Sequence, residues 1–250
     1  MKNRWMVIGF AALTVAVQAE VDFSGPLYKA GDTFEGTVRL LPESDQMIGR
    51  FMQGASAEIK EGLLVIKSGA DANTTSAWLR DIKPVDLTGG FFRMVEFKVD
   101  KPGDGAGLVF ALVDEDEGAG GSVNIVSYRE NLLLGLNVNY VGENLALFIR
   151  RSGVDKYEGF SSGKWQPAHA AAARLELGTL YRAELGYDPG ADRVTYKLSA
   201  VTSGEEICSG GYPRSEMSSD LAGHASCRFI AGEPFSNSSK GWGFSIRSIK

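Results

Sequence analysis

Short strand-like segments recur along this chain at short intervals, and glycine-rich turns separate them. Alternating or continuous apolar residues mark the segments 91–99, 132–141, 144–151, 180–187 and 193–200. The 31 glycines, against only eight prolines, fit a chain with many tight turns. We count about ten such strands, no long helical pattern and no internal repeat. The pattern predicts an all-β protein, an antiparallel β-sandwich or jelly roll, rather than an α/β fold.

The segment 132–141 indicates which side of one sheet is buried. One set of alternate positions is apolar and holds Leu132, Leu134, Leu136, Val138 and Tyr140. The intervening positions hold Leu133, Gly135, Asn137 and Asn139. Alternation of this kind predicts a strand with one face on the core and the other partly exposed to water.

Other segments complete the predicted sandwich. Residues 58–67 predict either a strand pair or one bent strand around Gly62, and residues 107–113 predict a strand buried on both faces. In the final segment, 241–249, we assign Trp242 to the core because it shares a face with Phe244 and Ile246.

Two segments do not fit the strand pattern. Residues 167–174 predict the one short helix, because a proline precedes a run of alanines. Residues 202–239 are rich in serine and glycine and predict a long loop.

The N-terminus predicts export. Lys2 and Arg4 form a short positive region, an apolar stretch of about a dozen residues follows, and Ala19 ends a run with small residues at the cleavage positions. We expect a signal peptide over residues 1–19 and a single β-sandwich domain over residues 20–250, secreted or periplasmic. The apolar stretch is too short to span a bilayer, so no membrane span is expected.

The charge balance argues against nucleic acid as a partner. The formal net charge is −5, and removing Lys2 and Arg4 with the signal makes it 24 − 31 = −7. An acidic chain without a basic run is poorly suited to a phosphate backbone.

The two cysteines, Cys208 and Cys227, predict one disulfide. An even count in an exported chain favours pairing, and a loop of this size could stabilise the fold by roughly 3 kcal/mol. Two thiolate metal ligands are the alternative, with His224 as the nearby imidazole, but no CxxC motif accompanies them.

Residues 177–188, LGTLYRAELGYD, resemble the LxxGxWYHVxLxYD strand of laminin-G-like and concanavalin A-like jelly rolls. Residues 243–250 resemble the closing strand of that superfamily, and residues 58–66 resemble an early strand pair, in the same order. The resemblance covers residues 55–250 and implies a concanavalin A-like β-sandwich. Leu180 stands where the family usually has Trp. The closing strand lacks an Asp that often helps hold a structural calcium, so the resemblance does not support a calcium site.

Catalytic and metal-binding motifs are weak. A hydrolase on this fold would show alternating acidic residues on one strand, whereas Glu96 and Glu184 are each isolated. Tyr212, Arg214 and His224 supply the residue types of a lyase site, a base and a neutraliser of a uronate carboxylate. The acidic turn with Asp114 and Asp116 supplies oxygen atoms for calcium but lacks an EF-hand pattern. We expect no cofactor.

Sugar recognition needs aromatic faces and planar hydrogen-bonding groups. Candidates off the predicted core face or in loops are Trp78, Tyr128, Arg129, Asn137, Asn139, Tyr157 and Trp165. We therefore favour an exported, non-catalytic, lectin-like domain whose partner is a polysaccharide or other glycan. A polysaccharide lyase or glycoside hydrolase on the same fold, and an exported structural or protein-interaction domain, stay open as alternatives. Oligomeric state stays open as well.

Overall fold

The computed structural model describes the chain as strands, apart from turns and one 3-10 segment, η1 (Arg214–Glu216). The described residues are 20–40, 47–52, 54–67, 76–81, 85–86, 90–103, 108–113, 132–141, 144–151, 160–161, 164–165, 173–216, 226–233 and 241–250. Their strands form two nine-stranded antiparallel sheets, which we name sheet A and sheet B, and a separate two-stranded sheet. The all-β prediction is confirmed.

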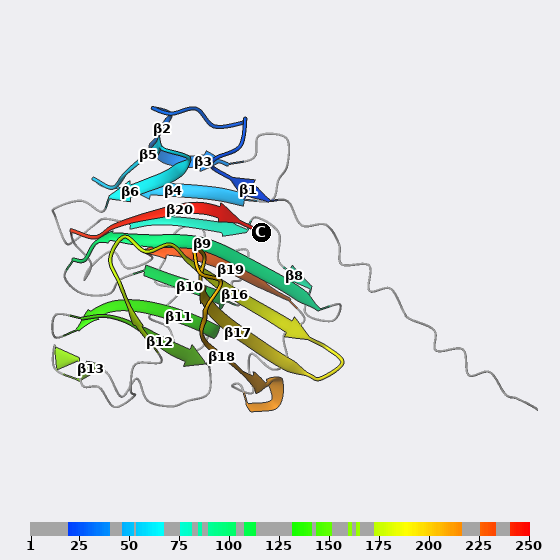
Figure 1. Ribbon diagram of the computed structural model, residues 1–250. Coiled ribbons are helices and arrows are strands. Elements are labelled where there is room, and N and C mark those ends of the chain that lie inside the picture. Colours follow the sequence, from blue (N-terminus) through cyan, green and yellow to red (C-terminus); the bar gives the residue numbers. More distant parts are fainter. Residues whose placement is uncertain are drawn as a thin grey trace, which may run out of the picture.

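Sheet A contains both ends of the described chain. Its order is β18 (Glu206–Pro213), β17 (Arg193–Ala200), β16 (Tyr181–Asp188), β9 (Phe91–Lys101), β20 (Gly243–Ile249), β6 (Leu63–Lys67), β5 (Ser56–Lys60) and β2 (Thr33–Phe34). The short β1 (Val21–Asp22) pairs with β20, so the first and last strands lie side by side (Figure 1).

Sheet B is built mostly from the middle of the chain. Its order is β15 (Ala173–Leu175), β12 (Asn144–Arg151), β11 (Leu132–Val141), β10 (Leu108–Val113), β19 (Ser226–Glu233), β7 (Ser76–Asp81), β4 (Met47–Met52) and β3 (Gly36–Arg39). The short β8 (Val85–Asp86) pairs with one end of β19. The two-stranded sheet joins β13 (Phe160–Ser161) and β14 (Lys164–Trp165).

The core lies between the inner faces of the two sheets. Phe97 of β9 and Phe110 of β10 are fully buried, and their ring centroids lie 4.4 Å apart, so they join sheet A to sheet B. In β20, Phe244 and Ile246 are buried on the same face, and Trp242 just before the strand is 1% exposed. The assignment of Trp242 to the core is confirmed.

Local turn chemistry explains the confirmed hairpins. Between β5 and β6, Glu61 and Gly62 both have positive φ, 55° and 73°. Two such residues make the type I′ turn whose twist matches paired strands. Between β16 and β17, the Asp188 carboxylate accepts hydrogen bonds from the backbone N–H groups of Gly190 and Ala191, at 2.9 and 3.2 Å.

Two predictions about residues 167–239 are corrected. Ala173 and Arg174, the end of the predicted helix, belong to β15, because pairing with β12 and burial of Leu175 override the helical preference of alanine. The predicted loop 202–239 contains the eight-residue strands β18 and β19. Two of the glycines that suggested a loop lie close to the neighbouring strand: a Cβ on Gly210 would lie 2.5 Å from the Tyr196 hydroxyl oxygen, and a Cβ on Gly211 would lie 2.6 Å from the Val194 carbonyl oxygen.

The predicted disulfide is also corrected, because Cys208 is a free cysteine in the structure. Cys208 lies on β18, the edge strand of sheet A, whereas Cys227 lies on β19 inside sheet B. The even cysteine count and the predicted export were therefore not sufficient to predict a disulfide.

Candidate functional site

Strands of sheet B contain three of the residues predicted to bind a ligand, Asn137, Asn139 and Trp78. In β11, Leu136 and Val138 are fully buried toward the core, so strand alternation places Asn137 and Asn139 on the opposite face. In β7, Ala77 and Leu79 are fully buried, which places Trp78 on that same outer face.

Asn137 and Trp78 also share one row across the sheet. Pairing runs from Asn137 to Val109 of β10, then to Gly232 of β19, then to Trp78. Continued in both directions, the row contains Phe148, Asn137, Val109, Gly232, Trp78, Arg50 and Thr37. Three strand spacings, roughly 14 Å, therefore separate the Asn137 and Trp78 positions along a straight line.

One other predicted ligand-binding residue, Trp165, belongs to a different sheet. Trp165 pairs with Phe160 in the separate two-stranded sheet. Tyr128, Arg129 and Tyr157 lie outside the described residues.

The candidate lyase residues pack at the edge of sheet A. Tyr212 is half-buried on β18, stacks on Tyr196 with ring centroids 6.2 Å apart, and packs against the core. The Arg214 guanidinium lies 5.8 Å from the centre of the Tyr187 ring, and its backbone N–H donates to the Asp192 carbonyl at 2.9 Å. His224 lies outside the described residues. These contacts give Tyr212 and Arg214 a packing role.

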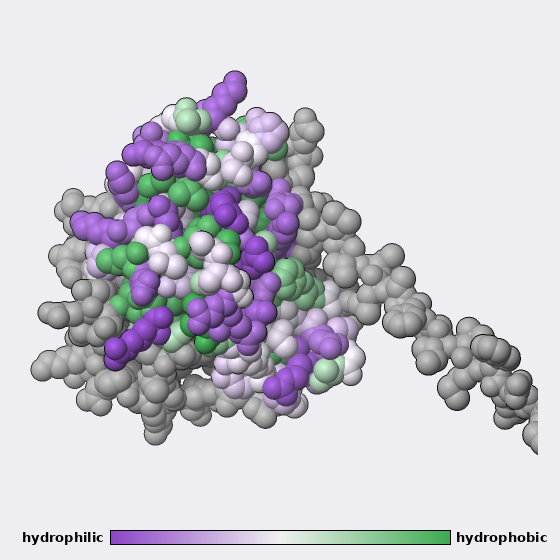
Figure 2. All heavy atoms as spheres, viewed as in Figure 1, coloured by the Kyte–Doolittle hydropathy of each residue, from purple (hydrophilic) through white to green (hydrophobic). Residues whose placement is uncertain are grey.

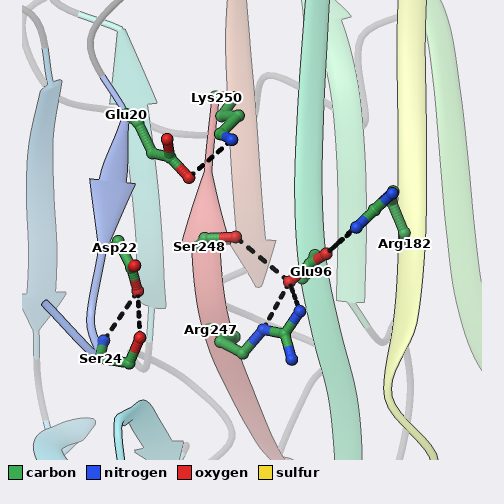
Figure 3. A network of polar contacts seen from close by, with 8 residues as sticks. All are labelled: Glu20, Asp22, Ser24, Glu96, Arg182, Arg247, Ser248 and Lys250. Carbon is green, nitrogen blue, oxygen red and sulfur yellow. Dashed lines mark hydrogen bonds and ion pairs between the residues drawn. The ribbon is translucent and has the colours of Figure 1, made fainter. Parts of the chain in front are cut away.

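Sheet A carries on its outer face a polar cluster that the sequence did not reveal. The Glu96 carboxylate is 4% exposed and receives two hydrogen bonds on one oxygen from Arg182, Nε at 2.9 Å and Nη2 at 2.6 Å. Its other oxygen accepts from Arg247 Nε at 2.5 Å and from the Ser248 hydroxyl at 3.4 Å, and it forms an ion pair with Arg247 Nη2 (Figure 3). The cluster ties β9 to β16 and β20.

Other contacts drawn in Figure 3 hold the residues at the two ends of the described chain. Lys250 forms an ion pair with Glu20 at 2.9 Å, and the Ser24 hydroxyl donates to Asp22 at 2.7 Å. That hydrogen bond holds the pKa of the Asp22 carboxyl below its usual value. With both Glu96 oxygens engaged by guanidinium groups, the cluster serves to join strands.

A groove of about 470 Å³ crosses the outer face of sheet A near its edge. Phe92, 45% exposed, stands at one side, and Gly186 and Thr195 follow it in register. Lys197 and Glu206 form an ion pair across it at 3.2 Å. Glu184 and Arg193 also line the groove, so its acidic and basic residues are equal in number. On the side of the molecule drawn in Figure 2, hydrophilic and hydrophobic described residues are interspersed.

Metal ligands are not grouped in the described part of the chain. Within it, no cluster of three or more His, Cys, Asp or Glu residues is placed to hold a metal ion. Asp114 and Asp116 of the acidic turn lie outside the described residues. The same described residues include no helix long and apolar enough to cross a membrane.

Comparison with known proteins identifies the architecture. No protein-family model matches the sequence, and no curated protein matches it. The VIP36 exoplasmic/lumenal domain in its Ca2+/Man2-bound form is similar in structure at 12% identity, with a TM-score of 0.51 over 80% of this chain and 79% of that one. Its metal-free form gives 11% identity and a TM-score of 0.50 over 80% and 82%. A Lotus tetragonolobus seed lectin gives 15% identity and 0.49 over 88% and 96%.

At these identities the likeness concerns the fold. The class is an antiparallel β-sandwich of the jelly-roll type, with two large sheets around one core. More particularly, the chain has the concanavalin A-like lectin fold, which confirms the resemblance found in the sequence.

Proposed function

We propose that this protein is an exported, non-catalytic carbohydrate-binding domain that holds a glycan on the outer face of sheet B. The observation that carries the proposal is the register that puts Asn137, Asn139 and Trp78 on one face of a lectin-type sandwich. Amide groups match the paired hydroxyls of a sugar, and an indole matches its C–H face. Fold alone does not assign function, so the proposal depends on these residues.

Export follows from the N-terminal sequence in this proposal. Residues 1–19 act as a cleaved signal peptide, and the mature domain meets its glycan outside the cytoplasm. The VIP36 domain similar in structure is exoplasmic or lumenal, which supports this assignment.

A lyase or hydrolase on the same fold is the second candidate, and a structural or protein-interaction domain is the third. The engagement of Glu96 by Arg182 and Arg247 supports a non-catalytic role for that carboxylate. An unsaturated product absorbing in the ultraviolet would establish a lyase, and new reducing ends without that absorbance would establish a hydrolase.

Affinity electrophoresis in gels containing soluble polysaccharides tests the proposal. We expect retardation in at least one gel and no cleared zone after the polymer is stained. Asn137→Ala and Trp78→Ala should weaken the retardation, and Trp165→Ala tests the two-stranded sheet separately. Thr33→Ala, an exposed position on β2 of sheet A, is the control. Unchanged mobility in every gel would refute glycan binding.

A further inference from the structure

A second groove, of about 450 Å³, lies on the outer face of sheet A and shares no lining residue with the groove beside Phe92. Its lining comes from β6 and β9, from the start of β20 between them, and from the turn that joins β5 to β6. Sites for small molecules have volumes of about 300–1,000 Å³. The groove is therefore large enough for a small ligand, and its lining residues indicate the chemistry of that ligand.

The floor of this groove is apolar. Leu64 and Ile66 of β6 are fully buried in the core. Strand alternation therefore turns Leu63 and Val65 to the outer face, where each is part-buried and lines the groove. Trp242, 1% exposed, lines it as well. An apolar ligand chain that covers these side chains leaves water, which favours binding.

Two lysines mark one end of the groove. Lys67 of β6 and Lys101 of β9 both pair with Gly243 of β20, so they flank a residue without a side chain. Two strand spacings, roughly 10 Å, separate the two lysine positions. Both lysines are exposed and line the groove, and their long, flexible stems allow the two ammonium groups to converge on one anion above Gly243.

The acidic residue at this end does not neutralise these two lysines. The Asp100 carboxylate forms an ion pair with Lys98 at 3.1 Å, and its other oxygen accepts a hydrogen bond from the Ser245 hydroxyl. Within the described part of the chain, neither Lys67 nor Lys101 takes part in an ion pair. Like charges repel each other, and an anion bound between them relieves the repulsion.

The opposite end of the groove has no such excess of positive charge. Lys60 and Glu61 both line it there and are consecutive residues at the turn between β5 and β6, so their opposite charges compensate. Leu63 lies four positions before Lys67 along β6, a distance of roughly 13 Å. The groove therefore runs from a cationic end, over an apolar floor, to an end without net charge.

We propose that this groove binds a small amphiphilic anion, a carboxylate that carries an extended apolar chain. The carboxylate lies between Lys67 and Lys101, where it accepts charge-assisted hydrogen bonds, and the chain extends over Val65 toward Leu63. The site belongs to sheet A, whereas the proposed glycan face belongs to sheet B. The inference therefore goes beyond the proposed function and does not depend on it.

Isothermal titration calorimetry of the full chain with decanoate tests this proposal. Decanoate combines a carboxylate with an extended chain that matches the length of the apolar floor. Decyltrimethylammonium has the same chain and the opposite charge, and acetate has the carboxylate without the chain. All three are titrated below the concentrations at which micelles form, at low and at high salt.

Three variants separate the parts of the site. Lys67→Gln/Lys101→Gln removes the two charges at the cationic end, and Val65→Thr puts a hydroxyl into the floor at nearly the same shape. Lys29→Gln/Arg174→Gln is the matched control, because both residues are exposed cations outside the groove. Thermal unfolding checks that each variant is folded.

We expect decanoate to bind the native protein, and decyltrimethylammonium and acetate to bind far more weakly. Affinity for decanoate should fall about ten-fold in the Lys67/Lys101 variant and should fall with rising salt, with the control variant unchanged. Val65→Thr should also weaken decanoate binding. Should the double lysine variant fail to fold, Lys101→Gln alone replaces it, with a smaller loss in the same direction.

Three results would overturn the proposal. The first is the absence of decanoate binding to the native protein. The second is binding of decyltrimethylammonium or acetate as tight as that of decanoate, since the site requires both the charge and the chain. The third is an equal loss of decanoate binding in the control variant, which would indicate a general effect of net charge.

Discussion

Glu96→Gln is predicted to destabilise the fold without affecting glycan binding. The carboxylate is 4% exposed, while the side chains of Arg182 and Arg247 are 42% and 38% exposed. Removing one partner of a fully buried pair costs about 3–5 kcal/mol, but partly exposed guanidinium groups recover hydration. Gln also keeps one oxygen acceptor. We therefore expect a loss of about 2 kcal/mol in the free energy of unfolding.

Thermal and denaturant unfolding measure this loss. In a domain of this size, about 2 kcal/mol lowers Tm by about 4–8 °C. Glu58→Gln, exposed on β5 of the same sheet, is the matched control and should change stability by less than about 0.5 kcal/mol. A double-mutant cycle with Arg182→Gln should be strongly non-additive.

Either of two results would refute the reasoning about Glu96. An additive cycle, with a Tm no lower than that of the Glu58 variant, would mean that the cluster does not hold the three strands together. Loss of glycan binding in a folded Glu96 variant would give the carboxylate a role in recognition.

Three further predictions concern other parts of the molecule. Burial raises the pKa of Tyr28 to about 12, whereas the phenol of the unfolded chain titrates near 10. The free energy of unfolding should therefore fall as the pH rises from about 10 to 12. In urea titrations at these pH values, Tyr28→Phe should make the fall smaller. Burial, and to a lesser extent the nearby Glu206 charge, raises the pKa of the Cys208 thiol, so alkylation of the native protein at neutral pH should be slow. After alkylation of the denatured, unreduced protein, mass spectrometry should find Cys208 modified. An unmodified Cys208 would indicate the disulfide. Phe92→Ala in the groove of sheet A should leave glycan binding unchanged, and weaker binding would place the glycan site in that groove.

Strand positions were predictable because they depend on local alternation. The bounds predicted for residues 132–141 and 144–151 coincide with β11 and β12, and 193–200 coincides with β17. Each combines side-chain alternation with a short turn, and both signals are contained in a few consecutive residues. The inward position of Leu136 and Val138 followed from the same alternation.

Features that depend on distant partners were not predictable in this way. Glu96 looked isolated, because Arg182 and Arg247 lie 86 and 151 residues further along the chain. Gly210 looked like a loop residue, because the Tyr196 ring that excludes a larger side chain there belongs to another strand. The candidate ligand residues could be selected by type, but not joined into a row without the order of the strands.

The arginines of the two sheets have different neighbours. On sheet A, Arg182 and Arg247 form ion pairs with the buried Glu96 carboxylate. On sheet B, Arg50 of β4 pairs with Trp78, and Arg80 of β7 pairs with Ile48. A count of arginines cannot distinguish these situations, because the difference lies in which strands become neighbours. The order of the strands in each sheet therefore decides which residue an arginine pairs with.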